Sequence, residues 1–261
     1  MIRSPFRDLP REVSILVAAS FFVAVGFGIV MPAIPVFAKS FGVNNAAIGL
    51  MVSAFAITRF ASGLISGTLV DKFGERKVFS TGVFMVSLFT FLAGVAQSYE
   101  QLLFFRAAGG LGSSMFSVAA SSVILRSVSD NQRGQAQSVY QGSFIVGGMA
   151  GPAIGGLLSV ISLRAPFFVY SILLLISGIV ALFFLKGDSI GAKVKDNNSE
   201  PATTIREALA MPPYRIALVL AFIGTWVFFG MRASILPVFV TEELNSTTAV
   251  VGYGFAISAI V

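Results

Sequence analysis

The chain has 261 residues, of which 56% are hydrophobic and only 11% are charged. Soluble globular domains carry about 25% charged residues, so this composition excludes an ordinary water-soluble surface. Cys and His are both absent, which excludes disulfides, thiolate or imidazole metal sites and Cys or His nucleophiles. The net charge of +6 does not form a nucleic-acid-binding face, because the Lys and Arg residues fall in separate loops. We therefore expect a polytopic membrane protein with no metal, cofactor or nucleic-acid partner.

Seven long apolar runs and a shorter eighth run follow one another along the chain. About 20 apolar residues cross the hydrocarbon of a bilayer, and helices satisfy their own backbone hydrogen bonds there. We therefore predict an all-α bundle of transmembrane helices in the lipid bilayer. The runs cover residues 13–37, 48–70, 78–96, 102–125, 136–161, 166–185, 216–240 and 249–261.

The Lys and Arg residues are divided unequally between the two sets of loops. Thirteen lie in the N-terminus and in the loops after the second, fourth and sixth runs, whereas the opposite loops hold only Lys39 and Arg164. Cytoplasmic loops carry an excess of Lys and Arg, so we expect a cytoplasmic N-terminus and a multi-pass protein of the plasma (inner) membrane. Three further arginines lie within the runs, namely Arg59, Arg106 and Arg232.

A polar segment, residues 187–213, separates the first six runs from the last two and reads as a cytoplasmic linker. Within it, residues 205–211 have the pattern of a short interfacial helix. We expect residues 1–186 to form a six-helix bundle and residues 214–261 to begin a second bundle. The sequence LPVF at 236–239 echoes IPVF at 34–37, which is consistent with a parallel repeat of two halves.

A charged turn lies between the second and third runs, with the sequence GTLVDKFGERK over residues 67–77. Gly74 supplies the permissive φ that a sharp turn needs. Gly63 and Gly67 lie four residues apart, so we expect them to admit a neighbouring helix at close range. The pattern Gly-x-Leu-x-Asp-(Lys/Arg)-x-Gly-x-(Arg/Lys)-(Arg/Lys) resembles the loop signature of the major facilitator superfamily of transporters.

The resemblance implies that Asp71 locks an outward-facing state through a charge network between two halves, with Arg133 as its local cation. Glu75 departs from the basic residue that is usual in this signature. The alternative is a charged loop that only fixes topology. The switch residues implied are Gly67, Asp71, Lys72, Gly74, Arg76 and Arg133.

The fourth run contains Arg106-x-x-x-Gly110-x-Gly112, which resembles a second motif of the superfamily. A guanidinium at membrane depth costs a few kcal/mol or more unless it faces a cavity or a partner. The resemblance links Arg106 to proton transfer, and the alternative is that its side chain extends to the interface. In the first run, Phe27 and Met31 near Pro32 and Pro35 would give an adaptable apolar wall. The pathway residues implied are Arg106, Gly110, Arg59, Arg232, Met31 and Phe27.

The fifth run contains GGMAGPAIGG over residues 147–156. Gly147, Gly151 and Gly155 recur at four-residue spacing and predict a groove for a neighbouring helix. Pro152 removes a backbone hydrogen bond and predicts a kink. With Gly156, the segment resembles the antiporter motif of exporters, Gly-x-x-x-Gly-Pro-x-x-Gly-Gly. The alternative is helix packing with no bearing on transport direction.

Taken together, the resemblance implies a twelve-helix fold, here ending within the eighth helix, that works as a secondary transporter by alternating access. It implies export of small lipophilic or drug-like molecules driven by a proton gradient, without enzymatic chemistry and without an obligatory protein partner. All twelve Asp and Glu residues lie in loops or at the ends of runs, so coupling would depend on Asp71, on other loop-edge acids or on further helices. Two alternatives are an uptake or metabolite carrier for sugars, amino acids or organic anions, and an inactive fragment.

Overall fold

A computed structural model describes residues 10–185, 205–227 and 244. The chain divides into two compact units, Met1–Val194 and Lys195–Val261, which are described separately. The eighth predicted run, Arg232 and the repeat at 236–239 lie outside the described residues.

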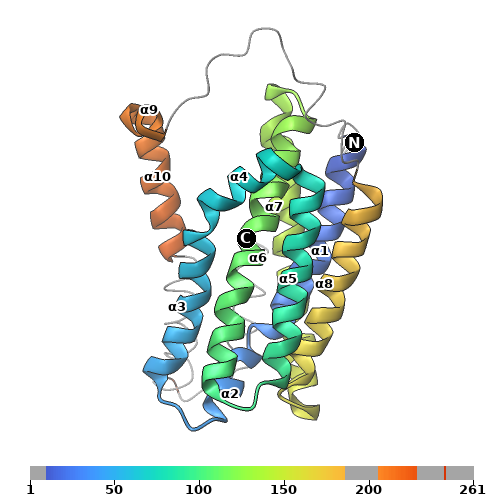
Figure 1. The fold of residues 1–261 in the computed structure, drawn as a ribbon, viewed down its shortest axis with the longest axis vertical. Helices are drawn as coiled ribbons and strands as arrows, with labels where there is room; N and C mark the ends of the chain where they lie inside the picture. The colour runs from blue at the N-terminus through green and yellow to red at the C-terminus, as the bar shows by residue number, and fades with distance from the viewer. Residues whose placement is uncertain (1–9, 186–204, 228–243, 245–261) are drawn as a thin grey trace. The chain divides into compact units, whose positions relative to one another are not determined.

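The first unit is an all-α bundle whose successive spans alternate in direction (Figure 1). Five segments are long and apolar enough to cross a membrane, and the pair α3 and α4 makes a sixth if it counts as one bent span. These segments confirm the first six predicted runs. The elements are α1 (Arg11–Val30), α2 (Ala33–Lys39), α3 (Asn45–Ala61), α4 (Gly63–Phe73), α5 (Glu75–Val95), α6 (Tyr99–Ser127), the short 3₁₀ helix η1 (Asp130–Gln132), α7 (Arg133–Ile161) and α8 (Ala165–Phe184).

Polar residues and glycine define several helix ends. Asn44 accepts a hydrogen bond from the Ala47 amide at 2.9 Å, which caps the start of α3. Ser98 accepts from the Gln101 amide at 3.3 Å and caps α6 in the same way. Gly74 separates α4 from α5 with φ of 84°, as the sequence predicts, because a residue without Cβ adopts this conformation without strain.

The second span is not straight, which the sequence analysis did not predict. Its parts α3 and α4 meet at Ser62 with a bend of 45° (Figure 1). The Ser62 hydroxyl donates to the Thr58 carbonyl at 2.7 Å, and the Ser66 hydroxyl donates to the Ser62 carbonyl at 2.8 Å. Side-chain hydrogen bonds of this type bend helices because they compete with the backbone ladder.

Glycines set the closest helix contacts of the first unit. A Cβ added at Gly82 of α5 would lie 2.7 Å from the Gly112 carbonyl oxygen of α6, and one at Gly112 would lie 2.5 Å from the Gly82 carbonyl oxygen. Backbones approach this closely only where both helices present small residues. Gly110 likewise meets α3, where an added Cβ would lie 2.6 Å from the Phe55 carbonyl oxygen. These contacts hold α6 tightly against α3 and α5.

In the second unit, the described residues form α9 (Ile205–Ala210) and α10 (Pro212–Thr225). Helix α9 confirms the short helix that the sequence predicts within the linker. Helix α10 begins with Pro at its first positions, where the missing amide hydrogen costs nothing.

Candidate conformational switch and substrate pathway

Three charged side chains meet where α4, α5 and α6 come together. Arg126 lies 3.1 Å from the Asp71 carboxylate and 2.8 Å from the Glu75 carboxylate. The Asp71 side chain is 73% exposed, whereas that of Glu75 is 4% exposed. The Ser122 hydroxyl also donates to Glu75 at 3.2 Å. Arg126 therefore joins an exposed acid to a buried acid, and we name these three residues the Arg126 cluster.

Local helix electrostatics favour both members of the buried pair. Glu75 lies in the first turn of α5, and Arg126 lies in the last turn of α6. Acidic groups are stabilised at helix N-termini and basic groups at C-termini. The sequence analysis included Arg126 only among the thirteen Lys and Arg residues of the N-terminus and the loops on that side, because its pairing partners are about fifty residues away along the chain. The unusual acid at position 75 was the available signal, since a buried acid needs a cation nearby.

Two expectations for the switch segment are corrected by the structure. Arg133 is not the cation beside Asp71: it pairs with Asp130 at 2.9 Å, one helical turn away, and Arg126 occupies the expected place. Gly67 does not face a neighbouring helix of the described residues, because an added Cβ there would meet none of their atoms within 4 Å. At Gly63 an added Cβ would meet only the Ser114 hydroxyl oxygen, at 4.0 Å.

Two basic residues of the switch segment lie close to this cluster in the chain. Lys72 is exposed, and its ammonium lies 5.4 Å from the centre of the Phe73 ring. Arg76 is half-buried in the first turn of α5. Their roles in switching remain predictions.

Arg106 lies inside the bundle on α6 and is 8% exposed. Its guanidinium carbon lies 4.6 Å from the centre of the Phe55 ring, which is a cation–π contact between α6 and α3. Its buried Nε has no hydrogen-bond partner among the described residues. The arginine is therefore enclosed by the bundle and does not extend to the surface, which contradicts the alternative considered for it.

Arg59 on α3 is held by two serines of α6. One terminal nitrogen donates to the Ser113 hydroxyl at 3.1 Å, and the other donates to the Ser117 hydroxyl at 3.0 Å. The two serines lie four residues apart, so they share one face of α6. The sequence analysis identified Arg59 but not these partners, although the four-residue recurrence of serine was visible.

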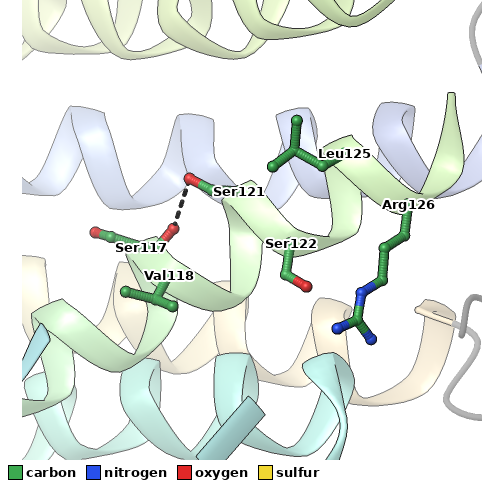
Figure 2. A pocket seen from close by; sticks show the side chains of 6 residues that line it. All are labelled: Ser117, Val118, Ser121, Ser122, Leu125 and Arg126. Atoms are coloured by element: carbon green, nitrogen blue, oxygen red, sulfur yellow. Dashed lines mark hydrogen bonds between the residues drawn. The ribbon is translucent and has the colours of Figure 1, made fainter. Parts of the chain in front are cut away.

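Beyond Ser117 the same part of α6 borders an open cavity of about 500 Å³. Figure 2 shows the hydroxyls of Ser117, Ser121 and Ser122 along the helix, with Arg126 toward its end. The cavity residues are Ser117, Val118, Ser121, Ser122, Leu125 and Arg126. The cavity thus extends from Ser117, which accepts a hydrogen bond from Arg59, to the Arg126 cluster.

The predicted glycine groove of α7 is present and receives α1. An added Cβ at Gly151 would lie 2.5 Å from Gly28 Cα, and one at Gly155 would overlap the Ile29 carbonyl oxygen. At Gly147 the added atom would lie 2.7 Å from Ala24 Cβ. Gly156 differs, because an added Cβ there would meet nothing within 4 Å.

Helix α7 continues through Pro152 from Arg133 to Ile161, so the proline does not end the helix, and the kink stays a prediction. In the first span, Phe27 is half-buried and packs against the core, whereas Met31 is 37% exposed. Contact of Met31 and Phe27 with a substrate stays a prediction.

The comparisons with known proteins agree with this architecture. Residues 16–261 match the family model of the Major Facilitator Superfamily. The chain is 25% identical over 259 residues to "Multidrug resistance protein 2" of Bacillus subtilis (strain 168), covering 96% of this chain and 64% of that protein. It is 27% identical over 218 residues to "Quinolone resistance protein NorA" of Staphylococcus aureus (strain MRSA252), covering 81% of this chain and 55% of that protein.

A further relative is "Multidrug efflux protein YfmO" of Bacillus subtilis (strain 168), which is 30% identical over 176 residues, or 67% of this chain and 44% of that protein. The chain therefore spans between 44% and 64% of the length of these relatives. Among solved structures, the human organic anion transporter MFSD10 (TETRAN) superposes with a TM-score of 0.60 at 19% identity, over 68% of this chain and 48% of that one. The chain is a multi-pass membrane protein that belongs to the Major Facilitator Superfamily.

Proposed function

We propose that this chain forms part of a secondary transporter that exports small lipophilic molecules by alternating access, with a proton gradient as the driving force. The N-terminus and the Arg126 cluster would lie on the cytoplasmic side of the membrane. The observation that carries the proposal is the seating of α1 against Gly151 and Gly155 of α7. This motif resembles that of exporters, and the relatives named as resistance and efflux proteins support the same direction.

The Arg126 cluster supplies a switch of the kind that alternating access requires. Interactions that differ between two states set the balance between them. Asp71 is exposed and makes its ion pair at the rim of the unit, so this contact can be exchanged at low cost. The buried Glu75 holds Arg126 in place while Asp71 changes partner.

The test is retention of the cationic dye ethidium in energised cells that express the full-length protein. Export predicts lower dye accumulation than in cells with an empty vector, and a protonophore should abolish the difference. Cells that show unchanged dye levels but faster uptake of a small polar solute would refute export in favour of a metabolite carrier.

The carrier alternative has one observation in its favour. Arg106 and Arg59 both lie within candidate spans, and a cation at membrane depth attracts anions. Uptake of a labelled sugar, amino acid or organic anion by the same cells separates the two functions.

A further inference from the structure

Arg59 is a charged group whose hydrogen-bond partners are all neutral. Both terminal nitrogens donate to serine hydroxyls, at 3.1 Å to Ser113 and 3.0 Å to Ser117. It makes no ion pair with any described residue of the first unit. By contrast, Arg126 and Arg133 each contact a carboxylate. The two serines fix the orientation of the Arg59 guanidinium without neutralising its charge.

This arrangement is rich in hydrogen-bond donors. A guanidinium has five N–H donors, and two of the nitrogens use one donor each on the serines. A serine that accepts a hydrogen bond still has its own O–H to donate. Arg59 and Ser117 therefore present free donors around one positive charge, whereas Ser113, which is 3% exposed, fixes the guanidinium from the buried side of α6. Such a surface matches a carboxylate, which accepts several hydrogen bonds and carries the opposite charge.

The space for the rest of a ligand adjoins this group. Ser117 holds Arg59 and also lines the open cavity along α6. Val118 and Leu125 give the cavity an apolar wall. At its far end Arg126 is already paired with two carboxylates. The uncompensated positive charge beside the cavity is thus that of Arg59.

We infer that Arg59 and Ser117 bind the carboxylate of an amphipathic substrate whose apolar body occupies the adjoining open cavity, and that Ser113 orients the Arg59 guanidinium. The inference rests on the proposed export function and adds to it a preference for lipophilic molecules that carry a carboxylate, zwitterions included, over those that lack one. Arg106 is not part of this site, because its guanidinium stacks on the Phe55 ring.

Two dyes that differ only at the carboxylate provide the test. Rhodamine 110 carries a free carboxylate, and rhodamine 123 is its methyl ester. Binding to the purified full-length protein in neutral detergent is measured by fluorescence anisotropy, and export of both dyes from cells is measured separately. We expect tighter binding of rhodamine 110, with Arg59→Gln weakening it about tenfold or more, since hydrogen bonds to charged groups are among the stronger ones. Binding of rhodamine 123 should change little.

Arg59→Lys keeps the charge but loses the planar fork, so it should keep a reduced preference for rhodamine 110. The matched control is Lys39→Gln, which removes one exposed positive charge from the end of α2 and should leave the preference unchanged. Equal affinity of the unmodified protein for both dyes, or a parallel loss of both in Arg59→Gln and Arg59→Lys, would overturn the inference.

Dye binding to the purified protein tests the inferred site, and dye export from cells tests the proposed function. A binding preference without export of either dye would refute export and leave the carboxylate site supported. Export of both dyes at equal rates, with equal binding, would support export and refute the site. A lipid phosphate as the partner of Arg59 predicts that added phosphatidylglycerol abolishes the preference for rhodamine 110, which would also overturn the substrate assignment.

Discussion

The contact between α1 and α7 gives the sharpest prediction. Alanine substitutions at neighbouring glycines of α7 should change the stability of the protein in opposite directions. A Cβ at Gly151 would lie 2.5 Å from Gly28 Cα, whereas ordinary contacts between carbon atoms are about 3.5–4.0 Å. The two backbones must therefore separate locally by about 1 Å. Overpacking of this kind costs about 1–3 kcal/mol, so Gly151→Ala should lower the stability of the protein.

Gly148 and Gly156 are matched controls on the same helix. A Cβ at either would meet no atom within 4 Å in the part of the chain that the structure describes, and alanine is favoured over glycine in a helix by about 0.5–1 kcal/mol. Gly148→Ala and Gly156→Ala should therefore leave stability unchanged or raise it. The midpoints of thermal unfolding in detergent measure the difference. Equal midpoints for Gly151→Ala and Gly156→Ala would show that α1 does not lie in this groove.

The same contact predicts an effect on transport. Gly151→Leu adds a bulky side chain facing Gly28 and the Ile29 amide, so α1 cannot seat against α7. We expect this variant of the full-length protein to lose ethidium export while it still reaches the membrane. Gly156→Leu is the control and should retain export. Full export by Gly151→Leu would separate the groove from transport and leave it a packing feature.

Three other predictions concern the Arg126 cluster and the topology. Asp71→Asn should abolish export. It should change stability by only about 0–1 kcal/mol, because the ion pair of Asp71 is exposed. Export at the native rate would show that this turn serves only as a topology signal. Glu75→Gln should lower stability by about 1–3 kcal/mol, since it removes the buried partner of Arg126. The double variant Glu75→Arg with Arg126→Glu should unfold at a higher temperature than would follow from adding the losses of its two single variants, and strictly additive losses would argue against a direct pairing. A reporter fused after Asn197 should behave as cytoplasmic and one within residues 42–45 as external, and reversal of both signals would refute the orientation.

Features with a local cause could be predicted from the sequence. The length of the apolar runs gave the spans, and the four-residue spacing of glycine gave the groove of α7. Gly74 was identified because a turn between two helices requires a permissive φ. Each of these depends on residues close together in the chain.

Features that depend on tertiary contacts could not be predicted in the same way. Arg126 and Glu75 are distant in sequence. The family resemblance implied Arg133 as the cation beside Asp71, and nothing in the sequence distinguishes Arg133 from Arg126, which borders the same loop. Gly67 was expected to pack, but which face of α4 is covered depends on the bend at Ser62. That bend arises from hydroxyl groups bonding to the backbone, and serine and threonine do this in only some of the helices where they occur.

The bend at Ser62 also affects the position of the Asp71 carboxylate, which lies near the far end of α4. Helix α4 has 11 residues and is about 16 Å long at 1.5 Å per residue, so a bend of 45° carries its far end about 12 Å off the axis of α3. Asp71 lies in the last turn of α4 and reaches Arg126 from that displaced position. The Ser62 hydroxyl in the middle of the span thus affects the ion pair between Asp71 and Arg126 at the end of the span. Substitutions that straighten the helix, such as Ser62→Ala, would separate Asp71 from Arg126 without altering either charged residue.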